Sequence, residues 1–248
     1  MMRIELLNKL ARKKIFTIDE IANMTGIDRN PLKVLLSRLE KRGWLERIEK
    51  GKYIIIPLGA EKGEYTLHEF IIGSLLVKPS AIAYWSALNY HGFTEQIPNT
   101  VFVQTTARKK KQDLRIFGVR YKIVRIKPEK FFGIEKVWIE GFQVSITDGE
   151  KTVIDCLDKP RYCGGIIEVA KAFREELDTE RLREYALRMN NSAVIRRLGY
   201  LCDYFGVDID LPKPETRNYI LLDPTMPREG HVDSKWKVII NVELEGLE

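Results

Sequence analysis

Apolar residues near the start of the chain recur at the spacing of amphipathic helices. Ile4, Leu7 and Leu10 share one face of a first predicted helix, which ends near a basic cluster at residues 12–14. Basic side chains at that end interact favourably with the helix dipole. The pattern therefore predicts a helix at the beginning of the chain.

Two further helices are predicted close behind, with only a short connection between them. Residues 17–20 have the form of a capping box, and they open a second helix that Gly26 is placed to end. The third helix begins with Asp28 or Asn30 as its N-cap and tolerates Pro31 in its first turn. Its inward face is apolar at positions i, i+3, i+4 and i+7, which are Leu32, Leu35, Leu36 and Leu39.

The outward face of the third helix and the segment after it carry the candidate DNA contacts. Residues 44–48 and 52–57 are strand-like and flank a Glu-Lys-Gly turn, so they predict a hairpin, the wing. Short polar, basic and small apolar side chains suit base edges, a thymine methyl group and phosphates in a major groove. The candidate DNA-binding residues are Arg29, Asn30, Lys33, Val34, Ser37, Arg38 and Lys41 on the helix, with Lys50 and Lys52 on the wing.

The rest of the chain mixes helical and strand-like patterns. Two helices are expected first, from a capping box at residues 66–69 to Val77 and from Ser80 to Tyr90. Stretches rich in Val, Ile, Phe and Tyr then predict the strands of a mixed or antiparallel sheet, at residues 101–105, 119–126, 136–139 and 142–146. Later helices are predicted at residues 147–157, where residues 147–150 form a third capping box, and at 166–177, 180–189 and 192–205. Residues 212–227 are expected to be loose, and residues 236–244 to form a last strand.

These patterns place the chain in the α+β class, with two domains. Residues 1–58 are predicted to form a winged helix-turn-helix that binds double-stranded DNA. Residues 64–248 are predicted to form a larger mixed α/β domain with a helical C-terminal half. A winged helix that binds protein instead of DNA is the alternative for the first domain.

The distribution of charge favours the DNA-binding alternative. The chain has 248 residues and a net charge of +6, and the first 57 residues hold 13 Lys and Arg against seven Asp and Glu. The remaining residues carry 28 charges of each sign, so the whole excess lies in the N-terminal quarter. A compact basic module beside a neutral one indicates a polyanionic partner for the first.

Composition also bears on location and on the cysteines. The longest apolar run, residues 70–77, is far shorter than the roughly 20 residues of a membrane span, and the N-terminus lacks the pattern of a signal peptide. We therefore expect a cytoplasmic protein. Cys156, Cys163 and Cys202 are odd in number and show no C-x-x-C pairing, so we expect them to be reduced and buried, with no zinc site.

Catalytic candidates are few, and we expect neither an enzyme nor a cofactor. His91 sits at a predicted helix end, where a structural capping role is favoured over acid and base chemistry. A metal-dependent nuclease would use carboxylates and a lysine, for which the candidates are Asp148, Glu150, Lys151 and Asp155. Their spacing suits that role poorly. The basic run at residues 108–111 is either a solvated turn or an auxiliary phosphate-binding loop.

Three further stretches of the second domain carry a family likeness: Ser86-Ala-Leu-Asn-Tyr-His-Gly92 with Ile97-Pro98 following, Ile146-Thr-Asp-Gly-Glu-Lys-Thr-Val-Ile-Asp155, and Gly164-Gly-Ile-Ile-Glu-Val169 followed by Arg197-Leu-Gly199. Together with the N-terminal module, they resemble the AbiEi-type antitoxins, which are transcriptional regulators of type IV toxin-antitoxin (abortive infection) systems. The resemblance covers most of the chain, and the sequence departs from the family pattern after Asp210.

The resemblance implies an autorepressor with two separate tasks. Its winged helix would bind repeats upstream of its own operon, and its C-terminal domain would counter a toxin that resembles a nucleotidyltransferase. In a type IV system the two proteins need not form a stable complex. The alternative is an orphan regulator whose C-terminal domain binds a ligand or an oligomerisation partner.

Overall fold

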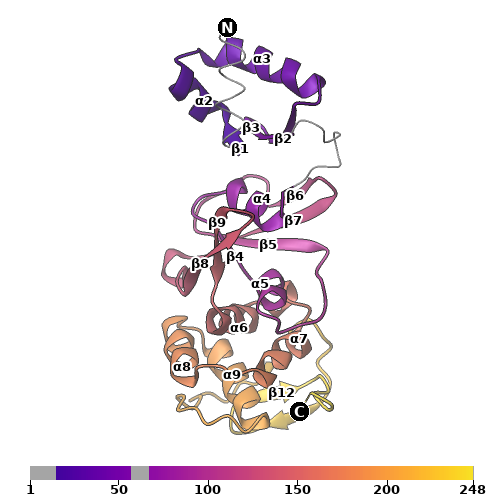
Figure 1. The fold of residues 1–248 in the computed structure, drawn as a ribbon. Helices are drawn as coiled ribbons and strands as arrows, with labels where there is room; N and C mark the ends of the chain where they lie inside the picture. The colour runs from indigo at the N-terminus through magenta and orange to yellow at the C-terminus, as the bar shows by residue number, and fades with distance from the viewer. Residues whose placement is uncertain (1–14, 57–66, 248) are drawn as a thin grey trace. The chain divides into compact units, whose positions relative to one another are not determined.

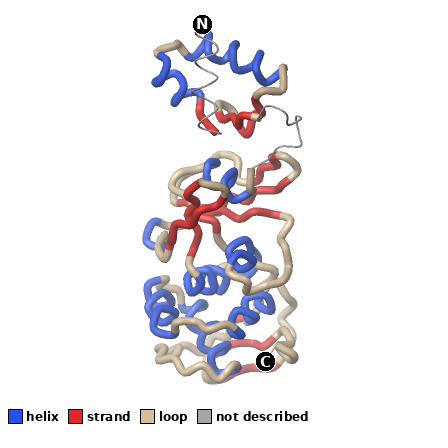
Figure 2. The backbone as a smooth tube through the Cα atoms, viewed as in Figure 1, coloured by secondary structure: helices blue, strands red, loops and turns tan. Residues whose placement is uncertain are grey.

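The computed structural model describes residues 15–56 and 67–247, and the chain divides into two compact units, with the boundary in the sequence between His68 and Glu69. Figures 1 and 2 show the elements of each unit. The helix predicted from Ile4, Leu7 and Leu10 lies outside the described residues, as does the start of the capping box at residues 66–69. Within the part described, no helix is long and apolar enough to cross a membrane.

The N-terminal unit combines two helices with a three-stranded sheet. Its elements are β1 (Ile15–Thr17), α2 (Ile18–Thr25), α3 (Arg29–Lys41), β2 (Leu45–Glu49) and β3 (Lys52–Ile55). The sheet order is β1-β3-β2, and both pairings are antiparallel. Both described helices and the β2–β3 hairpin agree with the sequence predictions. Strand β1 was not predicted. It has only three residues, too few to show an alternating pattern, and its partner strand begins far away in the sequence, at Lys52.

Local capping fixes the ends of α2. The hydroxyl of Thr17 accepts a hydrogen bond from the Glu20 amide, and the Glu20 carboxylate accepts one from the Thr17 amide, so the predicted capping box is formed. Gly26 ends the helix in a left-handed conformation, with φ at 68°. Asp28 occupies the N-cap position of α3, although its side chain makes no capping bond.

The C-terminal unit is built on a six-stranded mixed sheet in the order β6-β7-β5-β4-β9-β8. Its strands are β4 (Ala81–Ile82), β5 (Thr100–Thr105), β6 (Asp113–Ile116), β7 (Val119–Arg125), β8 (Ile134–Ile139) and β9 (Phe142–Thr147). Helix α4 (Glu69–Leu76) covers one face, while α5 (Trp85–Tyr90) and α6 (Gly149–Asp158) lie on the other (Figure 1). The α+β class is therefore correct.

Helices and a small sheet complete this unit. The helical elements are α7 (Ile166–Ala170), the 3₁₀ turn η3 (Lys171–Arg174), α8 (Thr179–Arg188) and α9 (Ser192–Tyr204). Strands β10 (Ile220–Leu221), β12 (Val238–Ile240) and β11 (His231–Asp233) form the second sheet of the unit, in that order. All three cysteines are free and buried.

Several element boundaries differ from the sequence predictions. The helix expected over residues 80–90 starts only at Trp85, because residues 81 and 82 form β4 in the middle of the sheet, where both faces are buried. The helix expected over residues 166–177 tightens to a 3₁₀ turn after Ala170 and ends at Arg174. The expected last strand is limited to β12, and strand β6 after the basic run was not predicted at all.

The third capping box is also wrong. Asp148 is the N-cap of α6, and its side chain accepts from the Lys151 amide at 2.7 Å. Thr147 is the last residue of β9, and its buried hydroxyl lies 2.7 Å from that of Thr152. Glu150 accepts instead from the amide of Asp178, at 3.0 Å.

Two buried arginines of α9 hold the irregular C-terminal segment. Arg196 donates to the carbonyl oxygens of Trp236, Asn218 and Lys237. Arg197 donates to the carbonyl of Leu157 at 2.9 Å, and to those of residues 221 and 222. Burial lowers the pKa of both guanidinium groups from its usual value.

Close packing on the same helix fixes the position of Trp236. A Cβ atom placed on Gly199 would lie 2.4 Å from the ring of Trp236, whose side chain is 1% exposed. The indole nitrogen of Trp236 also donates to Asp203 at 2.6 Å. Glycine is therefore required at position 199 because the indole ring occupies the space of a side chain.

We expect Gly199→Ala to lower the free energy of unfolding by about 1–3 kcal/mol through overpacking against Trp236. Urea denaturation monitored by tryptophan fluorescence measures this change. Helix propensity alone would raise stability by up to about 1 kcal/mol. A stabilised Gly199→Ala variant would therefore contradict this packing.

A buried ion pair lies inside α6. Lys151 and Asp155 stand one turn apart and form an ion pair, with side-chain exposures of 0% and 3%. Burial raises the pKa of Asp155, and the adjacent Lys151 ammonium lowers it. The ammonium also lies 4.8 Å from the centre of the Phe132 ring.

We expect Lys151→Met and Asp155→Leu each to cost about 3–5 kcal/mol of stability, since each leaves an unpaired buried charge. The double variant should cost clearly less than the sum of the two. Chemical denaturation of all three variants tests this coupling. Glu129→Ala, in an exposed ion pair with an N–O distance of 3.7 Å, is the control and should cost under about 1 kcal/mol. Additive losses in the double variant would refute the coupling.

Candidate nucleic-acid interface

Helix α3 separates its apolar and polar side chains onto two faces. Leu32 and Leu36 are fully buried and Leu39 is 6% exposed, so they fix the inward side against Phe16 and Ile21. Every predicted contact residue on this helix is exposed, namely Arg29, Asn30, Lys33, Val34, Ser37, Arg38 and Lys41. The structure thus brings these seven side chains together on the outward side.

The cations on this face differ in how they are held. Arg29 forms an ion pair with Asp19 in the first turn of α2, which links the two helices and offsets part of its charge. Lys33 lies 3.5 Å from the side-chain oxygen of Asn30. Among the described residues, Arg38 and Lys41 have no carboxylate partner, so their charges remain available to an anion.

One aliphatic side chain stands among these polar residues. Val34 is 53% exposed, although its helix neighbours at Leu32 and Leu36 are buried. An exposed valine between lysine and arginine contributes little to the core. It is the kind of side chain that contacts the methyl group of thymine.

The two predicted wing residues are not equivalent. Lys50 is exposed in the turn between β2 and β3. Lys52 is half-buried, and its ammonium lies 3.4 Å from the carboxylate of Glu49. The amide of Ile18 donates to the Gly51 carbonyl at 2.8 Å, which ties the turn to the start of α2.

One further exposed cation follows this group directly in the sequence. Arg42 is the C-cap residue of α3, and the sequence analysis did not name it as a contact. The helical period ends at Lys41, so the period gave no reason to include Arg42. The neighbouring run of basic residues at 41 and 42 was the available signal.

The residues considered for a nuclease do not converge on one point. Asp148 caps α6, Glu150 bonds to the amide of Asp178 and lies 3.2 Å from Arg181, and Lys151 pairs internally with Asp155. No cluster of three or more potential metal ligands occurs among the residues that the structure describes. These four side chains therefore have structural partners in place of a shared centre.

The other candidates from the sequence, His91 and the basic run at residues 108–111, also contact the backbone of neighbouring segments. The Nε2 atom of His91 lies 2.7 Å from the Thr147 carbonyl, which ties the end of α5 to the end of β9. The basic run at residues 108–111 forms the connection between β5 and β6, with Lys109 donating to the Leu76 carbonyl at 2.7 Å.

The chain is similar in fold to a solved structure described as "Crystal structure of RV2827C protein from Mycobacterium tuberculosis". The likeness covers 94% of this chain and 89% of that chain, with a TM-score of 0.66 and 15% sequence identity. At this identity the likeness concerns the fold alone. No curated protein matches the chain in sequence.

The N-terminal unit matches a protein family in sequence. Residues 5–56 match the family described as "Transcriptional regulator, AbiEi antitoxin". The matched range contains α2, α3, the hairpin and all nine predicted contact residues. The match confirms the resemblance drawn from the sequence over these residues, which do not include the three later stretches. Over residues 5–56, the chain is therefore similar to the AbiEi antitoxin family of transcriptional regulators.

Proposed function

We propose that the N-terminal unit is a winged helix-turn-helix that binds double-stranded DNA through the outward face of α3. The observation that carries this proposal is that face itself, where seven exposed polar, basic and aliphatic side chains lie opposite the buried residues Leu32, Leu36 and Leu39. The family match over residues 5–56 supports it, because that family is described as transcriptional regulators.

The side chains on this face suit direct reading of bases. Asn30 has the amide needed for a bidentate contact with adenine, and Lys33 and Arg38 can donate to guanine. Val34 supplies an apolar contact for a thymine methyl. Lys41, Arg42 and the wing residue Lys50 are placed to neutralise phosphates, which position the protein without reading sequence.

The finer function that we propose is autorepression by the antitoxin of a type IV toxin-antitoxin pair. The DNA partner is the operator upstream of its own operon. The second partner is a toxin that resembles a nucleotidyltransferase, countered without a stable complex. The support is the family description and the division of the chain into two compact units, which allows separate tasks.

We expect Lys33→Ala combined with Arg38→Ala to abolish selective operator binding. Each residue should contribute roughly 1–3 kcal/mol if it makes a bidentate base contact. Fluorescence anisotropy of the full chain with its own upstream DNA and with a scrambled duplex, at two salt concentrations, measures both affinity and selectivity. Binding should weaken steeply with salt because phosphate contacts release counterions.

The matched control is Arg217→Ala combined with Arg228→Ala, which removes the same charge from exposed positions in the C-terminal unit. It should leave selectivity for the operator unchanged. If the α3 double variant kept wild-type affinity and selectivity, the outward face of α3 would not be the DNA-binding surface.

We expect co-expression of the chain to relieve growth arrest caused by a nucleotidyltransferase-like toxin from the same operon. The Lys33→Ala and Arg38→Ala variant should retain this effect when both genes are under external promoters, because its substitutions lie in the other unit. Colony counts under toxin induction are the measurement. Failure of the wild-type chain to relieve arrest would refute the antitoxin role and leave DNA binding to be judged on its own assay.

A further inference from the structure

The C-terminal unit has a groove on a part of the sheet that the helices leave uncovered. The groove has a volume of about 560 Å³ and is open to solvent. Its floor is formed by β5, β7 and the edge strand β6, and Tyr162 of the 3₁₀ turn Pro160–Tyr162 (η2) forms a wall. A volume of this size accommodates one or two nucleotides or a comparable small ligand.

Strand pairing gathers the charges of this groove onto one face. Thr100 on β5 lies opposite Arg120 on β7, which in turn lies opposite Arg115 on β6. In the next row Phe102 faces Lys122, which faces Asp113. Directly paired residues project from the same side of a sheet, so both rows line the groove.

The balance of charge in the groove is positive. The ammonium of Lys122 and the carboxylate of Asp113 form an ion pair, with an N–O distance of 2.8 Å. The Arg115 side chain donates only to the Gly118 carbonyl at 3.3 Å, and the Arg120 side chain has no hydrogen-bond or ion-pair partner among the described residues. Two arginines on neighbouring strands are thus left without a carboxylate.

An aromatic ring stands beside these cations. Tyr162 is half-buried and packs edge-on against Tyr84, with ring centres 5.4 Å apart, and against Phe102 at 5.8 Å. The guanidinium of Arg161 lies 4.7 Å from the centre of the Tyr162 ring. The neighbouring rings hold Tyr162 in place next to the arginine pair.

We propose that this groove binds single-stranded nucleic acid, with phosphates at Arg115 and Arg120 and a base against Tyr162. Surfaces that bind single strands combine cations that follow the backbone with aromatic rings on which bases stack. A duplex keeps its bases stacked on one another, so it offers no free base face to Tyr162. Because the groove opens at the edge of the sheet, a single strand of nucleic acid can enter and leave it.

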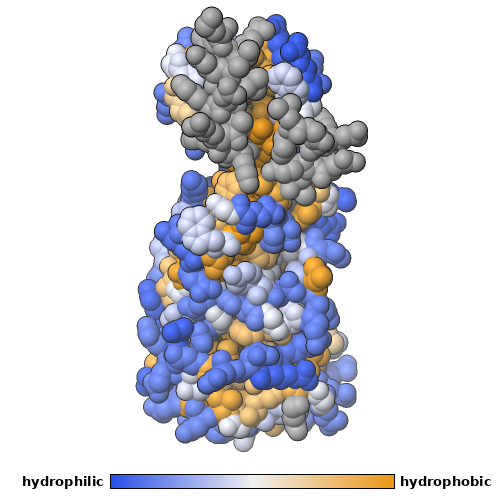
Figure 3. All heavy atoms as spheres, in the orientation of Figure 1, coloured by the Kyte–Doolittle hydropathy of each residue, from blue (hydrophilic) through white to orange (hydrophobic). Residues whose placement is uncertain are grey.

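A solvated sheet edge is the alternative explanation for these charges. Charged side chains on an edge strand prevent pairing with other molecules, and Asp113 and Arg115 on β6 serve that purpose. That role requires neither Arg120, which lies on the inner strand β7, nor an aromatic wall. Figure 3 shows that the visible face of this unit is mostly hydrophilic, so charge alone does not single out a site. The test must therefore include the ring.

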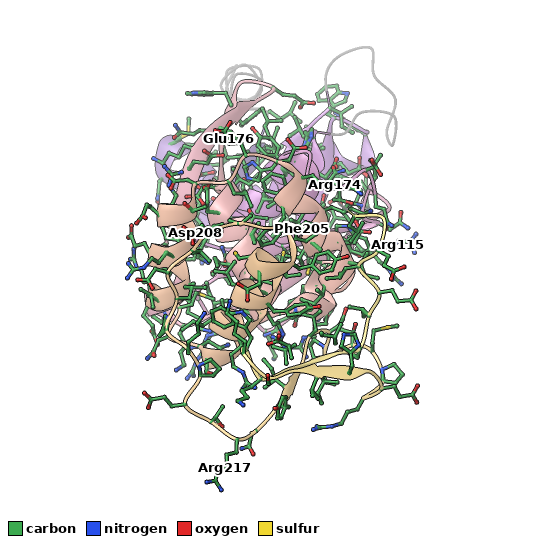
Figure 4. All side chains as sticks on the ribbon, turned by 90° about the horizontal axis from the view of Figure 1, so that it is seen from below. Arg115, Arg174, Glu176, Phe205, Asp208 and Arg217 are labelled. Atoms are coloured by element: carbon green, nitrogen blue, oxygen red, sulfur yellow. The ribbon has the colours of Figure 1, made fainter. Side chains whose placement is uncertain are left out.

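The experiment uses the full chain carrying Lys33→Ala and Arg38→Ala, so that α3 contributes little to binding. A fluorescent single-stranded 12-mer of mixed sequence, as DNA and as RNA, is titrated by anisotropy at several salt concentrations. Further substitutions are then compared in this background: Arg115→Ala with Arg120→Ala, Tyr162→Leu, and Tyr162→Phe. The control is Arg217→Ala with Arg228→Ala; Arg217 lies at the tip of a loop, well away from Arg115 (Figure 4).

We expect the arginine double variant to weaken binding about tenfold or more and to lower the salt slope by roughly 0.7 for each phosphate that the protein no longer neutralises. Tyr162→Leu should weaken binding about fivefold or more at an unchanged salt slope, because stacking releases no counterions. Tyr162→Phe keeps the ring and should restore affinity. Thermal unfolding confirms that each variant is folded.

Four outcomes would overturn the proposal. They are the absence of single-strand binding, an equal loss in the Arg217 and Arg228 control, a loss in folded Tyr162→Leu that Tyr162→Phe does not restore, and competition by a matching duplex as strong as by the single strand. Binding of free AMP at an affinity equal to that of the 12-mer would assign the groove to a mononucleotide instead. None of these outcomes depends on operator recognition by α3.

Discussion

The C-terminal unit depends on two buried guanidinium groups of one helix. Arg196 and Arg197 of α9 donate to backbone carbonyls of the segments around β10 and β12, and Arg197 also reaches Leu157 at the end of α6. The strands of these segments pair over only two or three residues, so buried side-chain donors satisfy carbonyls that the short ladders leave unpaired. These contacts bring the C-terminal segment into the core, where Trp236 fills the space left open by Gly199.

This packing explains why polar side chains with catalytic potential serve structure here. Helix α6 lies between the sheet and α9, so its inward positions are surrounded by protein on every side. In that setting Lys151 and Asp155 pair with each other, because an isolated charge would be costly. Asp148 and Glu150 at the start of the same helix satisfy backbone amides of α6 and of the segment before α8.

The two surfaces that we propose to bind nucleic acid are built in different ways. The outward face of α3 lies on a single helix, whose leucines pack into the core of the N-terminal unit. Its polar residues therefore come together without segments that are distant in the sequence. The groove of the C-terminal unit draws Arg115, Arg120 and Tyr162 from three elements, none of which forms the site alone. A helix face suits the major groove of a duplex, whereas a sheet face with an aromatic wall suits an unpaired strand.

The sequence by itself determined the elements whose signals are local. The heptad-like leucines of α3, the capping box at Thr17 and the confinement of net charge to the first 57 residues all lie within a short stretch of chain. Where the interacting residues are far apart in the sequence, only the tertiary structure decided which elements form and which side chains meet. Residues 15–17 and 81–82 become strands only because β3, β5 and β9 are present to pair with them, and Arg120 meets Arg115 only through strand register. Helical periodicity depends on neighbouring residues. The pairing of strands and the carbonyls to which a buried arginine donates depend instead on segments far away in the sequence.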